Sequence, residues 1–525
     1  MRLGTIDSAN PVPLRVVKLS DFSATPISNL SDTLNTPSPS KFILDVLKLV
    51  GGSAVAQGLT VITAPIVARL FAPAAFGIAA LFTSITSIVI VISCLRYELS
   101  IMLPKADEEA ANLLGLSVCS VSVISLLTGL PVLLASDQLA ELFHAPNLKK
   151  YLWLIPLGVF IGGLFTALNH WNSRTKHFGR LSVARILSST VAQTTKIGVG
   201  FSGFVSGGVL IVTRLLGMFV STGVLFVQIW RTDQVLFRET IRLKAIVAGL
   251  QRYKEFPIYS IWSAMLIAVS QQFPFWILAF YFPTNVVGSF ALGRNVIMLP
   301  LTMVGSAVTM VFFQKSAEAV HRDGELQAVV GEVFKRLIIF GGFILFLLGL
   351  IGEEVFVIAF GARWSEAGVY TQILSLWMFA FFITSPISNL FYVLEKQAAF
   401  LLATVVTLSL RVLSLIIGGL SGNPRVALAL FSAVSTVTTL AVCCWLLAIA
   451  GVPIRHVFEY FKKFLQICVP LLGIIAVFKW VFKFNPLGVV CVGFFGVLIY
   501  YTIAFRSDRK LKENAALLIK RYRHI

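Results

Sequence analysis

Long stretches of this chain contain no charged residue, and residues 256–293 and 337–352 are two of them. A helix rises about 1.5 Å per residue, so about 20 apolar residues cross the hydrocarbon core of a bilayer. The chain is 57% hydrophobic and 13% charged, against about 25% charged in a typical soluble domain. We therefore predict an all-α polytopic membrane protein, because a membrane β-barrel would show short segments of alternating hydrophobicity.

The apolar stretches predict about fourteen transmembrane helices. Their expected limits are 42–70, 75–103, 110–135, 151–170, 182–202, 204–230, 256–282, 288–313, 337–358, 368–393, 398–420, 426–450, 464–482 and 486–505. Only residues 201–208 separate the fifth span from the sixth, and the turn expected there depends on Gly203.

The net charge of +19 lies mainly in loops. No aromatic-basic RNA-binding motif accompanies the basic residues, so nucleic acid is not an expected partner. Lys and Arg gather in alternate loops, such as 174–180, 231–254 and 455–463, whereas the loops between these carry few of them. Since cytoplasmic loops retain positive charge, these loops and both chain termini are expected to be cytoplasmic.

Three segments are expected to lie outside the bilayer. Residues 1–40 are rich in Ser, Thr, Pro, Asp and Asn, which predicts a disordered cytoplasmic tail. Residues 231–255 are expected to form an amphipathic cytoplasmic linker, and 506–525 a basic cytoplasmic tail. No loop is long enough to build a soluble catalytic domain, so we expect no catalytic residues and no enzyme activity.

The order of the spans repeats once. Residues 41–230 and 256–450 are each expected to form a six-helix bundle, and 464–505 adds two further helices. An even number of spans per half makes the repeat parallel, with its axis along the membrane normal. Pro65 and Pro274 interrupt the first span of each half. Matched helix breaks point to a transport site, although a kink for packing alone is the alternative.

Basic residues within the spans predict a cationic cavity. The deepest are Arg214 and Arg411, and Lys196 and Arg294 also fall within spans. Such a charge costs about 2.5–3.5 kcal/mol on insertion scales and usually faces a cavity or a partner. No carboxylate is expected at mid-depth to pair with them, so the set predicts a water-filled cavity for an anionic substrate. Hydrogen bonds to backbone carbonyls or water are the alternative for each residue.

Arg96 and Glu98 lie near the end of the second span. Residues two apart on a helix do not face each other, so we expect each to find a separate partner or water. They either mark the helix end at the headgroups or form a cytoplasmic gate, with Arg96 in contact with substrate. Asp45 and Glu98 are the expected candidates for proton or cation coupling.

No cofactor or metal site is expected. The six cysteines all fall in apolar segments without metal-type spacing, and the six histidines form no ligand pair. No Gly-x-x-x-x-Gly-Lys-Ser/Thr loop is present to bind a nucleotide.

Several motifs resemble those of a known transporter family. The segments are 49–57 (Leu-Val-Gly-Gly-Ser-Ala-Val-Ala-Gln), 71–77 (Phe-Ala-Pro-Ala-Ala-Phe-Gly), 95–104 (Leu-Arg-Tyr-Glu-Leu-Ser-Ile-Met-Leu-Pro), 107–112, 168–180 with 184–185, and 288–300. They are similar to the bacterial polysaccharide flippases, the Wzx-like transporters of lipopolysaccharide (O-antigen) and capsule biosynthesis. These belong to the multidrug/oligosaccharidyl-lipid/polysaccharide exporter superfamily.

The resemblance implies a fold and a function. Two six-helix bundles would form a V whose first, second, seventh and eighth spans line a central cavity. An undecaprenyl-pyrophosphate-linked oligosaccharide would move by alternating access from the cytoplasmic to the periplasmic leaflet of the bacterial inner membrane. The cationic set fits the pyrophosphate, and polysaccharide polymerase or assembly proteins would be partners.

Other functions remain open at this point. A multidrug or peptidoglycan-precursor exporter of the same superfamily is the first alternative, although a cation-drug exporter should carry mid-membrane carboxylates. An O-antigen polymerase or ligase is a second alternative. Such enzymes need a sizeable periplasmic loop, and the longest loop expected on that side is about 135–150.

Overall fold

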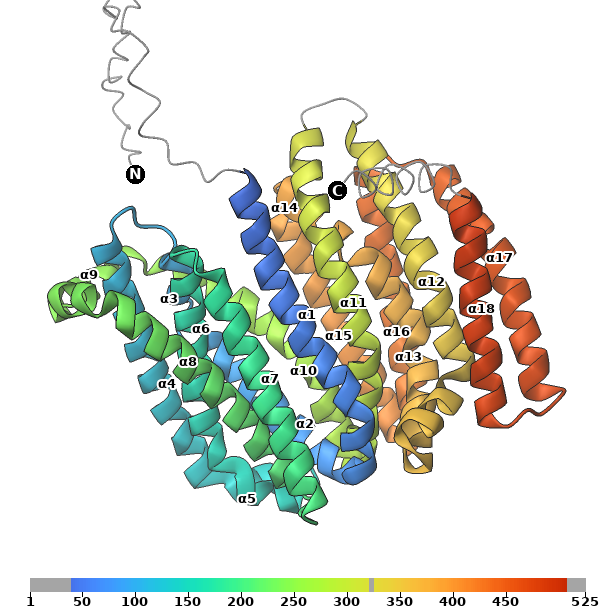
Figure 1. Ribbon diagram of the computed structural model, residues 1–525, viewed down its shortest axis with the longest axis horizontal. Coiled ribbons are helices and arrows are strands. Elements are labelled where there is room, and N and C mark those ends of the chain that lie inside the picture. The colour runs from blue at the N-terminus through green and yellow to red at the C-terminus, as the bar shows by residue number, and fades with distance from the viewer. Residues whose placement is uncertain (1–38, 321–324, 508–525) are drawn as a thin grey trace, which may run out of the picture. The chain divides into compact units, whose positions relative to one another are not determined.

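The computed structural model describes residues 39–320 and 325–507, without the side chains of 39–50, 299–300, 303–304, 306–307 and 310. The described backbone forms helices joined by turns and contains no strand (Figure 1). The predicted tails, 1–40 and 506–525, lie almost entirely outside the described residues. The chain divides into two compact units, Met1–Leu47 and Lys48–Ile525, and all the packing below lies within the second.

Fourteen long helices correspond one to one with the predicted spans. They are α1 (Pro39–Leu70), α2 (Pro73–Ser93), α4 (Asp107–Leu142), α6 (Leu154–Arg174), α7 (Phe178–Phe201), α8 (Gly207–Thr240), α10 (Ile261–Tyr281), α11 (Thr284–Ala319), α12 (Glu325–Phe360), α13 (Ser365–Thr384), α15 (Gln397–Leu420), α16 (Pro424–Ile449), α17 (Ile454–Trp480) and α18 (Pro486–Ser507). Short helices connect them: α3 (Tyr97–Ser100), η2 (Pro146–Leu148), α5 (Lys149–Leu152), α9 (Leu243–Arg252), η3 (Phe256–Ser260), η4 (Ala362–Trp364), η5 (Ile387–Asn389) and α14 (Leu390–Val393).

Twelve of the described helices are long and apolar enough to cross a membrane. The two other long helices are α7 and α11. Helix α7 carries Arg185, Gln193 and Lys196 among several Ser and Thr residues, and these lower its hydropathy. Several side chains of α11 lie outside the described set. The chain is therefore a multi-pass, all-α membrane protein, as predicted.

The helix ends follow local sequence rules. Gly203 has φ of +89° and forms the predicted turn between α7 and α8, a backbone conformation that glycine adopts without steric cost. Helix α2 has Pro73 at its first position after an extended Ala72, and α11 follows an extended Pro283. The first and seventh spans therefore end in similar turns.

The predicted helix breaks at Pro65 and Pro274 are wrong. Helix α1 continues through Pro65, and α10 continues through Pro274. Proline is tolerated within membrane helices because neighbouring groups can satisfy the freed carbonyl. The non-helical residues lie elsewhere, at Ala135 in α4 and Ile351 in α12, which are the third long helices of the two halves.

The predicted linker 231–255 does not form one amphipathic helix. Helix α8 continues to Thr240, and α9 begins at Leu243 after an extended Arg242. Helix α9 is amphipathic and packs against α4, where the Ile246 side chain approaches Gly115.

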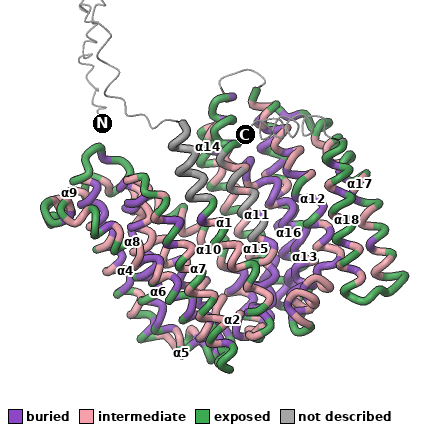
Figure 2. Tube along the Cα trace, in the orientation of Figure 1, coloured by how far each residue is buried: buried purple, intermediate pink, exposed green. Residues whose placement is uncertain are grey.

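Two groups of helices build the membrane region. Helices α2, α4, α6, α7 and α8 pack together, as do α10, α11, α12, α13, α15 and α16. Helices α17 and α18 pack against each other and against α12. Helix α2 joins the two groups by packing against α10 and α11. Buried residues concentrate in the interior of each group, whereas α17, α18 and the outer faces are largely exposed (Figure 2).

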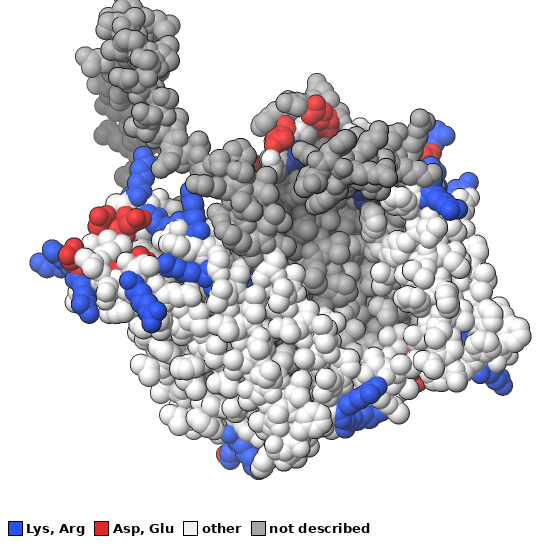
Figure 3. Space-filling view, in the orientation of Figure 1, with Lys and Arg blue, Asp and Glu red and all other residues white. Residues whose placement is uncertain are grey.

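Charged side chains gather at the two ends of the visible face, and a band of uncharged side chains lies between them (Figure 3). This distribution is the one expected of a protein surrounded by lipid, because an exposed charge in hydrocarbon is costly.

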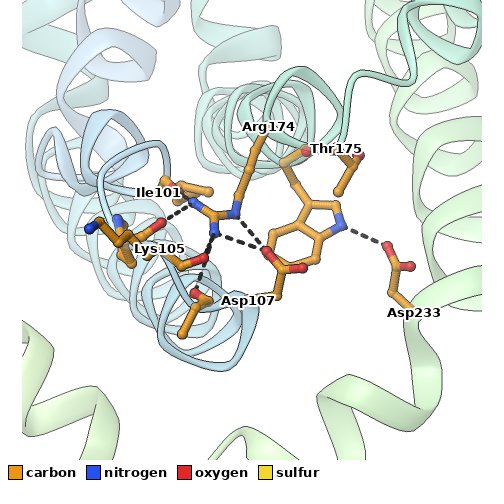
Figure 4. A network of polar contacts seen from close by, with 9 residues as sticks. Ile101, Lys105, Asp107, Arg174, Thr175 and Asp233 are labelled. Carbon is orange, nitrogen blue, oxygen red and sulfur yellow. Dashed lines mark hydrogen bonds and ion pairs between the residues drawn. The ribbon is translucent and has the colours of Figure 1, made fainter. Parts of the chain in front are cut away.

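A polar network fixes the loop between α3 and α4. The Arg174 guanidinium at the end of α6 donates to the carbonyl oxygens of Ile101 (2.9 Å) and Pro104 (2.8 Å) and pairs with Asp107 (2.9 Å). Figure 4 shows Arg174 directed into this loop, and nearby Asp233 accepts a bond of 2.8 Å from the Trp171 indole. Arg174 therefore holds α4 against α6.

Candidate functional site

A cavity of about 930 Å³ lies between the two groups of helices. Helices α1, α2, α6, α7 and α8 line one side, and α10 and α11 line the other. The first, second, seventh and eighth spans, which correspond to α1, α2, α10 and α11, thus all contribute to the lining, together with α6, α7 and α8.

Four basic side chains line this cavity: Arg185, Lys196, Arg214 and Arg294. No aspartate or glutamate is among the described lining residues. Lys196, Arg214 and Arg294 were predicted from the sequence, and the structure places them around one space. Because they come from three different helices, the positive charge surrounds the cavity instead of following one wall.

The four basic residues differ in how they are held. Arg185 donates to the Ser53 hydroxyl of α1, and Lys196 donates to Gln193 at 3.2 Å. Arg294 donates to Gln271 at 2.8 Å, with its guanidinium carbon 5.6 Å from the centre of the Phe275 ring. These neutral partners orient the basic groups without cancelling their charge.

Arg214 lies on α8, and its side chain is exposed within the cavity lining. Lys196, on α7, lines the same cavity. Two like charges facing one space would be stabilised by a bound anion.

A polar wall continues from the basic groups along the facing sides of α1 and α7. The Ser189 hydroxyl donates to the Ala56 carbonyl at 2.8 Å, and the Gln193 amide donates to the Thr60 hydroxyl at 3.3 Å. The Oε1 atom of Gln57 is buried and has no hydrogen-bond partner among the described groups. Hydroxyl and amide groups of this kind can bind the hydroxyls of a sugar.

Arg411 and Arg96 are not among the described residues that line the cavity, so the predicted cationic set is wrong for these two. Arg411 lies on α15, where it donates to Thr439 of α16 at 2.9 Å. Arg96 lies beyond the end of α2. A position within an apolar run of the sequence does not distinguish an arginine that faces the cavity from one that packs within a helix group.

The prediction of separate partners for Arg96 and Glu98 is also wrong. The two side chains form an ion pair of 3.1 Å, and Glu98 is buried. Leu95 and Arg96 have φ of +50° and +64°, so α2 ends before them and α3 starts after them. The spacing rule for helical neighbours does not apply across this break. The side chain of Asp45 lies outside the described residues.

Lys479 of α17 also carries a positive charge within a long helix. Its ammonium pairs with Glu354 at 2.8 Å and donates to the Leu350 carbonyl at 2.8 Å. This pair connects α17 to α12, and both side chains are mostly buried.

Of the four basic residues that line the cavity, Arg185 was not predicted from the sequence. It falls within the predicted span 182–202, but it lies close to the basic loop 174–180 and was grouped with it. Its position on the same helix as Lys196, eleven residues earlier, was the available signal. Within the described residues, no cluster of three His, Cys, Asp or Glu could hold a metal ion, and the six cysteines form no disulfide.

Comparison with known proteins identifies the family. A family model described as polysaccharide biosynthesis protein matches residues 66–369. No curated protein sequence matches the chain.

Two solved structures share the fold. One is the lipid II flippase MurJ in an inward closed conformation, with a TM-score of 0.68 and 14% identity, covering 89% of this chain and 99% of that chain. The other is a multidrug resistance MATE family transporter of the MOP superfamily in an inward-facing conformation. Its TM-score is 0.61 at 15% identity, covering 78% of this chain and 98% of that chain.

Proposed function

This chain belongs to the polysaccharide biosynthesis protein family, and on that premise we propose that it flips an undecaprenyl-pyrophosphate-linked oligosaccharide across a membrane. Repeat units of O-antigen, capsule or exopolysaccharide are the proposed cargo, moving from the cytoplasmic to the periplasmic leaflet. The observation that carries the proposal is the convergence of four basic side chains on a cavity without an acidic residue among its described lining. Such a cavity stabilises an anionic group that has left water.

The cavity offers two chemically different regions for such a molecule. The pyrophosphate would lie among Lys196, Arg214 and Arg294, because guanidinium groups donate paired hydrogen bonds to phosphate oxygens. The sugars would lie along the polar wall of α1 and α7. No covalent step is needed, so the protein would act without catalytic residues or a cofactor.

Transport would proceed by alternating access. The two helix bundles, residues 41–230 and 256–450, would move relative to each other, so that the cavity opens to one side of the membrane and then to the other. The proposed location is the bacterial inner membrane, with both termini in the cytoplasm, as the distribution of basic loops indicates. Polysaccharide polymerase or assembly proteins are the proposed partners that would receive the product.

The experiment that tests this function compares three cargoes in proteoliposomes. We expect transfer of a pyrophosphate-linked oligosaccharide to exceed that of a lipophilic cationic dye by at least about tenfold, because the cavity repels cations. Lipid II, which shares the pyrophosphate, tests selectivity for the sugar. Transfer of the dye alone would instead identify a multidrug exporter, and transfer of lipid II alone would identify a peptidoglycan-precursor exporter.

Ion coupling is proposed for Glu98, paired with Arg96, and for Asp45. The Oε2 atom of Glu98 is buried and has no hydrogen-bond partner among the described groups, so protonation of this carboxylate would change a buried charge. We expect the transport rate of Glu98→Gln to be nearly independent of pH. For Asp45→Asn we expect a weaker pH dependence than in the parent. Both are measured as initial rates between about pH 5 and 8. Parent-like pH profiles in both variants would exclude this role.

A further inference from the structure

Arg411 is a half-buried basic residue that the proposed transport mechanism does not use. It lies on α15, within the group formed by α10, α13, α15 and α16. Its guanidinium carbon lies 5.3 Å from the centre of the Trp377 ring of α13, and it donates to the Thr439 hydroxyl of α16 at 2.9 Å. The guanidinium thus lies at the meeting point of three helices.

No carboxylate on the neighbouring helices neutralises Arg411. Helices α10, α14, α15 and α16 contain no acidic residue, and Glu366 is the single acidic residue of α13. Glu366 is already paired with Arg425. It lies eleven positions before Trp377 on α13, about 16 Å away along the helix axis. The positive charge of Arg411 is therefore uncompensated by the elements packed around it.

Three buried donors near this charge have no hydrogen-bond partner among the described groups: Arg411 Nε, Trp377 Nε1 and Ser435 Oγ. Ser435 is fully buried, and Trp377 is 6% exposed. Ser435 precedes Thr439 by one helical turn, and Phe431, one turn earlier, packs on Trp377 with ring centres 5.0 Å apart. The donors therefore come from one face of α16 and from the two helices that it contacts.

We propose that Arg411, Trp377 and Ser435 bind a small monovalent anion of chloride size between α13, α15 and α16. An uncompensated charge packed between helices and unpartnered buried donors are both costly, and a single anion accepting these bonds relieves both costs. One negative charge balances the one guanidinium, and the complete burial of Ser435 favours a monatomic ion over a phosphate. The site is separate from the transport cavity and does not depend on the proposed cargo.

Chloride binding is tested by thermal unfolding of the purified full-length protein in detergent. Sodium chloride is titrated against sodium gluconate at constant ionic strength, and sodium bromide serves as a second halide. We expect the unfolding midpoint to rise with chloride and with bromide and to saturate, because an ion that binds the folded state alone stabilises it. A midpoint that does not respond to either halide overturns the proposal and means that water satisfies these donors.

Variants then test whether the halide effect on the unfolding midpoint arises at this site. Arg411→Gln is expected to abolish the halide response, and Ser435→Ala and Trp377→Phe are each expected to raise the half-saturating concentration about tenfold. Should Arg411→Gln fail to fold, the halide responses of Ser435→Ala and Trp377→Phe test the site without it. Arg425→Gln, which changes an exposed arginine of the same helix group, is expected to keep the full response. Parent-like halide responses in all three site variants would overturn the assignment.

Discussion

Loss of the positive charges at Lys196 and Arg294 is expected to abolish transfer of a pyrophosphate-linked oligosaccharide. Both side chains line the cavity, on α7 and α11, and neither has an acidic partner among the described lining residues. A hydrogen bond to a charged group contributes about 1.5–3 kcal/mol, which corresponds to a factor of about ten to one hundred per residue. Lys196→Ala and Arg294→Ala should each lower the initial rate by that factor, and the double variant should show no measurable transfer.

The decisive comparison separates charge from structure. Arg294→Lys keeps a positive charge but loses the planar donor pair, so we expect it to retain more activity than Arg294→Ala. Arg425→Ala removes an exposed arginine that is paired with Glu366 outside the cavity, and its rate should match the parent. Parent-like transfer in the double variant, with unchanged thermal stability, would show that the cavity charge does not bind the cargo.

Substitution of Gly77 or Gly288 by alanine is expected to prevent the close approach of α2 and α11. A Cβ atom at Gly77 would lie 1.9 Å from the carbonyl oxygen of Thr284, and one at Gly288 would lie 1.8 Å from that of Pro73. The contact is reciprocal, and backbone atoms cannot move aside as a flexible side chain can. Since overpacking costs about 1–3 kcal/mol or more, we expect each variant to lower the transport rate at least about tenfold.

Labelling at position 68, together with unchanged thermal stability, reports whether the contact between α2 and α11 has opened. Ala68 is fully buried, and its carbonyl accepts a bond of 2.7 Å from the Trp364 indole. The Trp364 ring packs edge-on against Phe76, the residue before Gly77. In a background without native cysteines, an Ala68→Cys reporter should react with a water-soluble maleimide faster when Gly77→Ala is present. Gly58→Ala in α1 is the matched control, because no atom lies within 4 Å of the added Cβ. A Gly77→Ala variant with parent-like transport and labelling would contradict this account.

The sequence by itself determined the helices. Each long helix overlaps one predicted span, although α2 and α13 end about ten residues before the expected limits, and the short turn at Gly203 separates α7 from α8 as expected. This information is local, because a bilayer requires about 20 apolar residues wherever the chain crosses it, and glycine allows the backbone to turn. The family resemblance, which rests on contiguous motifs, was likewise readable from the sequence and agrees with the matching family model.

Only the tertiary structure decided which basic residues share a site. Arg214 and Arg411 have the same local signature, a lone arginine in an apolar run, yet Arg214 lines the cavity and Arg411 packs within a helix group. The rotation and neighbours of each helix separate them, and these depend on contacts between residues far apart in the chain. The Arg96–Glu98 pair shows the same limit on a smaller scale. Two residues with positive φ end the helix there, so a rule based on regular helical spacing could not place these side chains.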